Sequence, residues 1–191
     1  GILTYVVLIL IGIVVTFPFM WMLSTSFKSL EEATTPSLTL FPRKLLWENW
    51  VTAFRFAPFG RYFVNSFIVA TSVTLLVCMT SLLAGYAFAK IRFPLKGLLF
   101  SIVMLTMMVP FESILIPNFI FISRLGWYNS YLGLIVPWSA SAFSILLVRQ
   151  AFLSVPEEYF DSAKVDGCSH WKFLIYLGIP LIKPMIVTVG L

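Results

Sequence analysis

The feature that most constrains this chain is its series of long apolar segments. Residues 2–23 and residues 62–89 contain no charged side chain, and residues 97–123 contain only Glu112. Residues 132–148 form a fourth apolar segment, and a fifth begins at Leu181. A helix needs about 20 mostly apolar residues to cross a hydrocarbon core of about 30 Å. We therefore predict an all-α protein that spans a membrane several times.

The composition agrees with lipid as the main solvent. Hydrophobic residues make up 60% of the chain and charged residues 11%, whereas a soluble domain carries about 25% charge. The net charge of +5 is spread over short loops, which is typical of membrane topology signals and not of a nucleic-acid surface. The only histidine, His170, and the separated Cys78 and Cys168 form no metal-ligand pattern, so we expect no metal site and no disulfide.

The chain divides into a first transmembrane helix at residues 1–27, a connector at residues 28–61 and a core domain at residues 62–191. Within the connector, the segment LLWENWVTAF at residues 45–54 has a short amphipathic pattern with two tryptophans. That pattern fits a helix along the membrane surface, and equally an ordinary polar connector.

Basic residues in one short loop predict the orientation. Lys90, Arg92 and Lys96 crowd this loop without an acidic partner, which places it in the cytoplasm by the positive-inside rule. Alternation then places residues 149–172 in the cytoplasm as well, and the connector outside the cell.

Prolines interrupt several of the apolar segments. Pro18, Pro110, Pro117 and Pro137 each remove a backbone donor and crowd the preceding turn. Such breaks persist in lipid only where neighbours or a water-filled cavity satisfy the freed carbonyls, and transporters use broken helices in this way.

A polar island at residues 154–180 separates two apolar segments. Ser154 followed by Glu157 predicts a capping box at a helix start. Asp166 and Gly167 predict the end of that helix, and Ser169 predicts the cap of a second one. The local prediction is a helix–turn–helix that lies along the membrane surface.

One face of the first island helix is partly apolar. Tyr159, Phe160 and Ala163 recur at helical spacing. Such a stripe either docks into a groove on a partner or packs against the chain's own membrane domain.

The run DSAKVDGCSHWKFLIYLGIP resembles the EAA loop of permease subunits of ATP-binding-cassette (ABC) importers, commonly E-A-A-x-x-D-G-A followed by an apolar stretch and a proline. Six residues fill the positions of that motif: Asp161, Ser162, Ala163, Asp166, Gly167 and Cys168. The segments STSFKSLEE, RYFVNSFIVA, LLAGYAFAKIRFP and VPFESILIP are similar to the carbohydrate-uptake, maltose-type branch. The resemblance implies the type I importer transmembrane fold, with five spans begun here, the last one cut short, and a natural protein that extends further.

The resemblance also implies what the protein does and with what. It implies a permease in the plasma membrane of a bacterium or archaeon that moves a di- or oligosaccharide by alternating access, with glycerol phosphate or another polyol as the alternative cargo. The implied partners are a second permease, two copies of a cytoplasmic ATPase and an extracytoplasmic solute-binding protein. ATP and magnesium would bind the ATPase, because this sequence has no G-x-x-x-x-G-K-[ST] phosphate loop. The alternative from a different class of protein is a secondary transporter that works without an ATPase.

Two groups of site residues follow, and neither is catalytic. The resemblance assigns an ATPase-docking role to the coupling loop: Glu158, Tyr159, Phe160, Asp161, Ser162, Ala163, Asp166, Gly167 and Cys168. The substrate path is expected to include Asn65, Glu112, Asn118 and Ser139. Glu112 is the only carboxylate inside an apolar segment. Its burial in lipid would cost several kcal/mol, so it should face a cavity, a partner helix or the outer interface.

Overall fold

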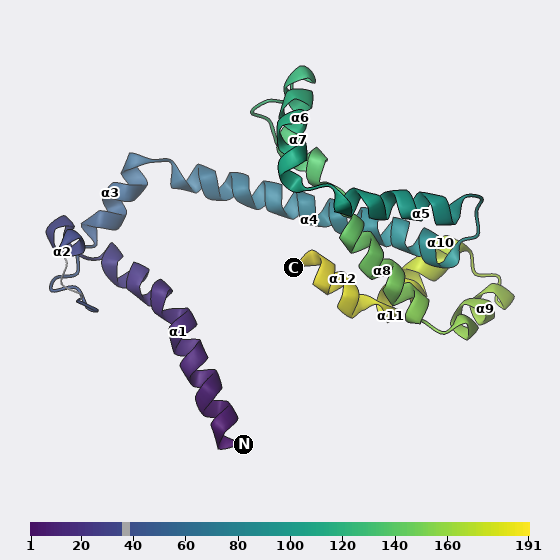
Figure 1. Ribbon diagram of the computed structural model, residues 1–191, viewed down its shortest axis with the longest axis horizontal. Helices are drawn as coiled ribbons and strands as arrows, with labels where there is room; N and C mark the ends of the chain where they lie inside the picture. The colour runs from purple at the N-terminus through teal and green to yellow at the C-terminus, as the bar shows by residue number, and fades with distance from the viewer. Residues whose placement is uncertain (36–38) are drawn as a thin grey trace. The chain divides into compact units, whose positions relative to one another are not determined.

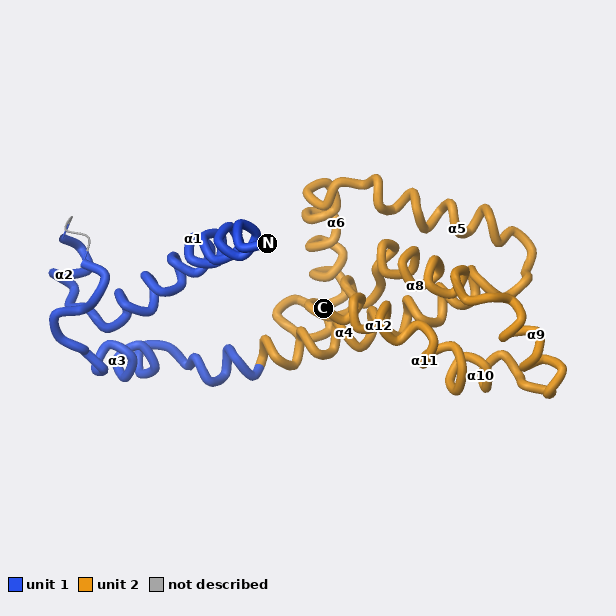
Figure 2. Tube along the Cα trace, turned by 90° about the horizontal axis from the view of Figure 1, so that it is seen from below, with its two compact units in different colours: residues 1–64 blue, residues 65–191 orange. Residues whose placement is uncertain are grey.

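The computed structural model describes residues 1–35 and 39–191, and every regular element within them is a helix (Figure 1). This confirms the prediction of an all-α chain. The described residues form two compact units, residues 1–64 and residues 65–191 (Figure 2). Residues 36–38 of the predicted connector lie outside the described part of the chain.

The first unit contains a single long apolar helix. Helix α1 (Ile2–Ser26) is 25 residues long and has no buried residue, so its apolar side chains face outward all round. At about 1.5 Å per residue it extends roughly 37 Å, which is enough to cross a bilayer. Its length and composition therefore fit the first predicted span.

The connector folds back onto the end of α1. It contains α2 (Leu30–Thr34), which Ser29 caps, and α3 (Glu48–Phe56), which covers most of the predicted amphipathic segment. The amide of Asn49 donates to the carbonyls of Ser26 and Lys28 at 3.0 and 2.8 Å. The connector is therefore folded structure in its described part.

The remaining predicted spans fall into one continuous helix and three bent pairs. Helix α4 (Phe59–Lys90) has the length and hydropathy of a full span. In the first bent pair, α5 (Lys96–Leu105) with the 3-10 turn η1 (Thr106–Met108) is followed at 99° by α6 (Phe111–Arg124). In the second, α7 (Tyr131–Ile135) with the 3-10 turn η2 (Val136–Trp138) is followed at 44° by α8 (Ala142–Ser154). In the third, residues 170–181 are followed at 79° by α12 (Lys183–Gly190). The described chain thus has two full spans, or up to five if each bent pair counts as one.

The sharpest bend arises at a proline. Residues 97–123, predicted as a third span, break between η1 and α6, where Val109 is extended and Pro110 precedes the first residue of α6. A proline pushes the residue before it out of the helical region and cannot donate to the preceding turn. The sequence located this break but carried no information about its angle.

The core of the second unit lies where α4, α8, α9 (Glu157–Val165) and the segment after α9 meet. That segment runs through α10 (His170–Phe173), the π-helical η3 (Leu174–Gly178) and α11 (Ile179–Leu181). Eight residues form the buried cluster: Tyr86, Val148, Phe152, Phe160, Ala163, Phe173, Leu174 and Ile182. Two pairs of its aromatic rings meet edge to face, with centroids 5.2 Å apart for Tyr86 and Phe152 and 5.0 Å apart for Phe160 and Phe173.

Small residues let α4 and α8 approach closely. A Cβ atom added to Gly85 would lie 2.6 Å from Cγ1 of Val148 and 3.0 Å from the backbone nitrogen of Arg149. One turn earlier, Ser81 is fully buried. Two small residues four apart are a common contact surface between membrane helices.

We expect Gly85→Ala to destabilise the protein by about 1–3 kcal/mol, because the added methyl group overpacks the contact between α4 and α8. The measurement is the melting temperature of the detergent-solubilised protein. Gly97→Ala in α5 is the matched control, because nothing lies within 4 Å of its added Cβ. Equal melting temperatures for the two variants would contradict the close contact.

Candidate functional site

The polar island folds as two helices and a turn, but its first helix starts later than predicted. Ser154 is the last residue of α8, and its hydroxyl donates back to the carbonyl of Ala151 at 2.8 Å. Helix α9 begins after Pro156, which stands at the N-cap position without a side-chain cap. The predicted capping box at Ser154 is therefore wrong. The physical reason is that Pro156 holds Val155 extended and so separates the two helices.

The end of α9 forms as predicted. Gly167 has φ +73, a left-handed conformation that suits glycine. Its N–H donates to the carbonyl of Lys164 at 3.0 Å, and the N–H of Cys168 donates to the carbonyl of Ala163 at 2.8 Å. These two bonds make a Schellman motif. The side chain of Ser169 then accepts from the N–H of Lys172 and caps α10.

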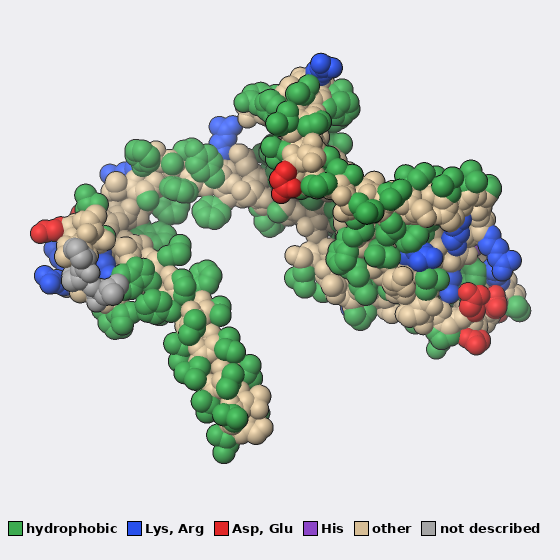
Figure 3. All heavy atoms as spheres, in the orientation of Figure 1, with side chains coloured by type: hydrophobic (Ala, Val, Ile, Leu, Met, Phe, Trp, Pro, Cys, Tyr) green, Lys and Arg blue, Asp and Glu red, His purple; other side chains and the backbone are tan. Residues whose placement is uncertain are grey.

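The predicted docking residues divide into an inward and an outward set. Phe160 and Ala163 are each only 6% exposed and lie in the core of their own unit. Cys168 is partly buried and packs against the same core. The other six are exposed: Glu158, Tyr159, Asp161, Ser162, Asp166 and Gly167. Figure 3 shows that the acidic side chains of α9 gather at the edge of this unit beside a group of basic ones.

Two cations close the end of α4 beside the island. Nε of Arg149 donates to the carbonyl of Phe88 at 3.2 Å, and Nζ of Lys96 donates to the carbonyls of Ala89 and Ile91 at 3.2 and 2.9 Å. These carbonyls belong to the last turn of α4 or follow it directly, where a helix has no internal donors left. The basic loop that predicted orientation from sequence therefore also terminates this helix.

An aromatic contact joins α4 to the start of α10. The hydroxyl of Tyr86 and Nδ1 of His170 share a hydrogen bond of 3.0 Å. The ring of His170 also lies 5.6 Å from that of Phe160, centroid to centroid. Sequence reasoning missed Tyr86 as a contributor to this site, because nothing in its local sequence indicates a contact with the distant His170.

The predicted substrate-path residues lie in the second unit. Asn65 on α4 accepts a hydrogen bond of 2.7 Å from the hydroxyl of Tyr131. The carbonyl of Ser139, at the break between η2 and α8, accepts from the hydroxyl of Thr80 on α4 at 3.0 Å. Asn118 is partly buried on α6.

The two proline-associated breaks lie together. The rings of Phe111, the first residue of α6, and Trp138, the last of η2, have centroids 5.5 Å apart. Glu112 follows Phe111 in the first turn of α6 and is exposed, where the positive end of the helix dipole favours a carboxylate. Glu112 thus directly follows Phe111 in sequence, and Ser139 directly follows Trp138, the residue whose ring contacts Phe111.

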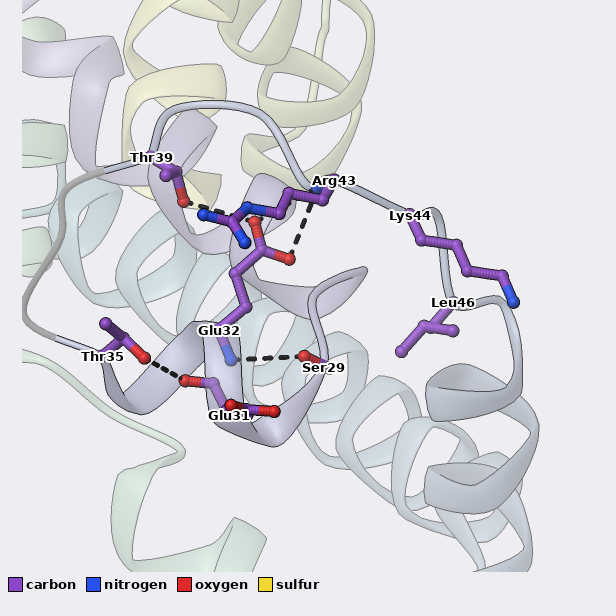
Figure 4. A pocket seen from close by; sticks show the side chains of 8 residues that line it. All are labelled: Ser29, Glu31, Glu32, Thr35, Thr39, Arg43, Lys44 and Leu46. Atoms are coloured by element: carbon purple, nitrogen blue, oxygen red, sulfur yellow. Dashed lines mark hydrogen bonds between the residues drawn. The ribbon is translucent and has the colours of Figure 1, made fainter.

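A separate pocket of about 530 Å³ lies in the first unit (Figure 4). Glu32 crosses one side of it and accepts from the N–H of Arg43 at 3.1 Å and from the hydroxyl of Thr39 at 3.4 Å. Its carboxylate therefore holds the connector onto α2, and we assign the pocket no further role.

Comparison with known proteins places this geometry in context. Residues 79–190 match the family model described as "Binding-protein-dependent transport system inner membrane component". The chain is 36% identical over 159 residues to the sn-glycerol-3-phosphate transport system permease protein UgpE of Pectobacterium atrosepticum, covering 80% of this chain and 57% of that protein. It is 32% identical over 179 residues to the lactose transport system permease protein LacG of Rhizobium radiobacter, covering 94% of this chain and 65% of that protein.

A solved structure shares the fold. The chain aligns over its whole length, with a TM-score of 0.87 and 23% identity, to 67% of one chain of a bacterial ABC transporter involved in the import of the acidic polysaccharide alginate. The present chain spans less than two thirds of the length of the two permease relatives, UgpE and LacG.

Proposed function

Because the chain belongs to the family of binding-protein-dependent transport system inner membrane components, we propose that it is the permease subunit of an ABC importer that carries a sugar across the plasma membrane of a prokaryote. The observation that carries this proposal is the family match, which runs from within α4 to the end of α12. The match includes α9 and residues 166–169, which form the turn between α9 and α10 and are called the α9 turn below. The permease itself performs no chemistry; it forms part of the path.

In this proposal a separate ATPase docks on the exposed edge of α9. That edge offers the carboxylates of Glu158, Asp161 and Asp166 and the ring of Tyr159 to the partner. Phe160 and Ala163 anchor the same helix to the core. Closure of two ATPase subunits on ATP and magnesium would move α9, and the packed core would transmit the movement to α4 and α8 as a rigid-body rotation. A second permease and a solute-binding protein complete the assembly.

The residues expected along the path fit a neutral cargo rich in hydroxyl groups. Asn65, Asn118 and Ser139 offer amide, hydroxyl and carbonyl groups, and Glu112 offers a carboxylate that accepts from hydroxyls. The relative from Rhizobium radiobacter is named for lactose, which supports a di- or oligosaccharide. The relative from Pectobacterium atrosepticum is named for sn-glycerol 3-phosphate, and that polyol phosphate is the second candidate cargo.

Uptake by cells that carry the full-length permease with its partner genes tests the proposal. We expect one labelled saccharide of a panel to accumulate, and only when both the ATPase and the binding protein are present. Preferential uptake of sn-glycerol 3-phosphate would favour the second candidate. Uptake that persists without the ATPase would overturn the importer proposal and indicate a secondary transporter.

Thiol labelling tests the proposed orientation. Cys168 follows the α9 turn, whereas Cys78 lies in the middle of α4. We expect a membrane-impermeant maleimide to label Cys168 in inside-out vesicles and not in intact cells, because the α9 turn faces the cytoplasm in this proposal. Cys78 should remain unlabelled in both, and a Cys168→Ser variant provides the blank. Labelling of Cys168 from the outer face would contradict the docking role of α9.

A further inference from the structure

The buried ammonium group of Lys90 lies between α4 and the island. The side chain is 3% exposed, and its Nζ atom donates to the carbonyl of Val155 at 3.2 Å. The same atom lies 3.7 Å from Oε1 of Glu157, whose side chain is 77% exposed. Both partners are more than sixty positions away in sequence, so these contacts join the end of α4 to the junction of α8 and α9.

A buried charge of this kind needs its partners. Removing a cation from water is costly unless hydrogen bonds and an opposite charge compensate for the lost hydration. Val155 is the extended residue that ends α8, and Glu157 is the first residue of α9. The contacts of Lys90 thus fall on the short junction between α8 and α9 (Figure 1) and on the first residue of α9 itself.

We propose that Lys90 is a positioning residue for coupling: it fixes the start of α9 to the end of α4, so that movement of the docked helix moves this span. The inference rests on the proposed importer function and adds a role to that site. The exposed docking residues of α9 would meet the partner, whereas Lys90 acts from inside the subunit. Without its ammonium group, the start of α9 loses these polar contacts to α4, and only the apolar contacts of the core remain to pass movement of α9 to α4.

Lys96 offers a matched comparison within the same loop. It is also a lysine that donates to backbone carbonyls, but its acceptors Ala89 and Ile91 lie within seven positions of it in sequence. Its bonds stabilise the local turn after α4 and do not reach α9. Making the same substitution at Lys90 and at Lys96 therefore distinguishes the loss of a contact between α4 and α9 from the loss of a local cap at the end of α4.

The experiment measures substrate transported per ATP hydrolysed by the reconstituted full-length complex in proteoliposomes. Lys90→Met retains the apolar stem and removes the charge. We expect this ratio to fall about tenfold, since a hydrogen bond from a charged group contributes about that factor to an equilibrium. Lys90→Arg should restore the ratio to within about threefold of wild type, because it keeps the charge and the donors. Lys96→Met should leave the ratio within about twofold.

Several outcomes would overturn the inference. An unchanged ratio in Lys90→Met, an equal fall in Lys96→Met, or the absence of rescue by Lys90→Arg would each do so. If Lys90→Met fails to accumulate, Glu157→Gln decides the question, because an exposed carboxylate contributes little to stability. We expect Glu157→Gln to lower the ratio about threefold, and an unchanged ratio would overturn the proposal. A wild-type complex without binding-protein-stimulated ATP hydrolysis would instead overturn the importer function itself.

Discussion

Replacing Gly167 by phenylalanine should lower transport by at least about 30-fold while the permease still accumulates in the membrane. No atom lies within 4 Å of a Cβ added to Gly167, so the new side chain starts in open space at the surface of its own subunit. The positive φ costs a residue other than glycine about 1–2 kcal/mol, which is too little to prevent accumulation in the membrane. The loss should therefore arise at the surface on which the ATPase docks. Uptake and the amount of membrane-inserted protein are measured on the same cells.

Two controls separate steric exclusion of the partner from backbone strain. Gly126, in the turn after α6, has φ +72 and equally open surroundings, so Gly126→Phe introduces the same strain far from the α9 turn in sequence. Gly167→Asn tolerates the left-handed conformation and adds only a short side chain. We expect both control variants to retain most of the transport. A loss in Gly126→Phe as large as that in Gly167→Phe would show that strain alone explains the result.

Replacing Phe160 by alanine should destabilise the second unit by about 3–5 kcal/mol. The ring is 6% exposed, packs edge to face on Phe173 and lies against His170. Its removal leaves a cavity in the cluster that anchors α9 to the membrane domain. The melting temperature of the solubilised protein and the protease sensitivity of residues 154–170 are the measurements.

Replacing the neighbouring Tyr159 by alanine should have the opposite effects. Its side chain is 52% exposed, so Tyr159→Ala should change the melting temperature little. In our proposal it should nevertheless reduce ATPase docking, because the ring belongs to the exposed edge of α9. If Tyr159→Ala destabilised the protein more than Phe160→Ala, the assignment of inward and outward faces would be wrong.

The features that sequence predicted are those set by local chemistry or by the thickness of the bilayer. The apolar segments had to become helices, because no other open structure satisfies its backbone in lipid. Gly167 and Ser169 specify a helix end and a helix start through their own conformational and hydrogen-bonding preferences. These predictions required no knowledge of distant residues.

The features that sequence missed depend on contacts between distant segments. Nothing near Phe160 indicates that it faces the core while Tyr159 faces outward, because both are aromatic and adjacent. The capping box at Ser154 failed because a continuing α8 and Pro156 together override a local capping preference. The role of Lys90 was hidden for the same reason, since its positive charge also fits a simple topology signal.

The π-helical segment Leu174–Gly178 fixes the length of the chain between the α9 turn and the final bend. A π-helix carries more residues per turn than an α-helix. Deleting one residue would let the segment tighten to α-helical geometry, and the residues beyond it would keep their facing because the extra residue of the π turn is the one removed. Ile182, which is 4% exposed, would then stay in the core. This stretch should therefore tolerate the loss of one residue better than a regular α-helix would, whereas its buried Leu174 and Gly178 should resist changes of side chain.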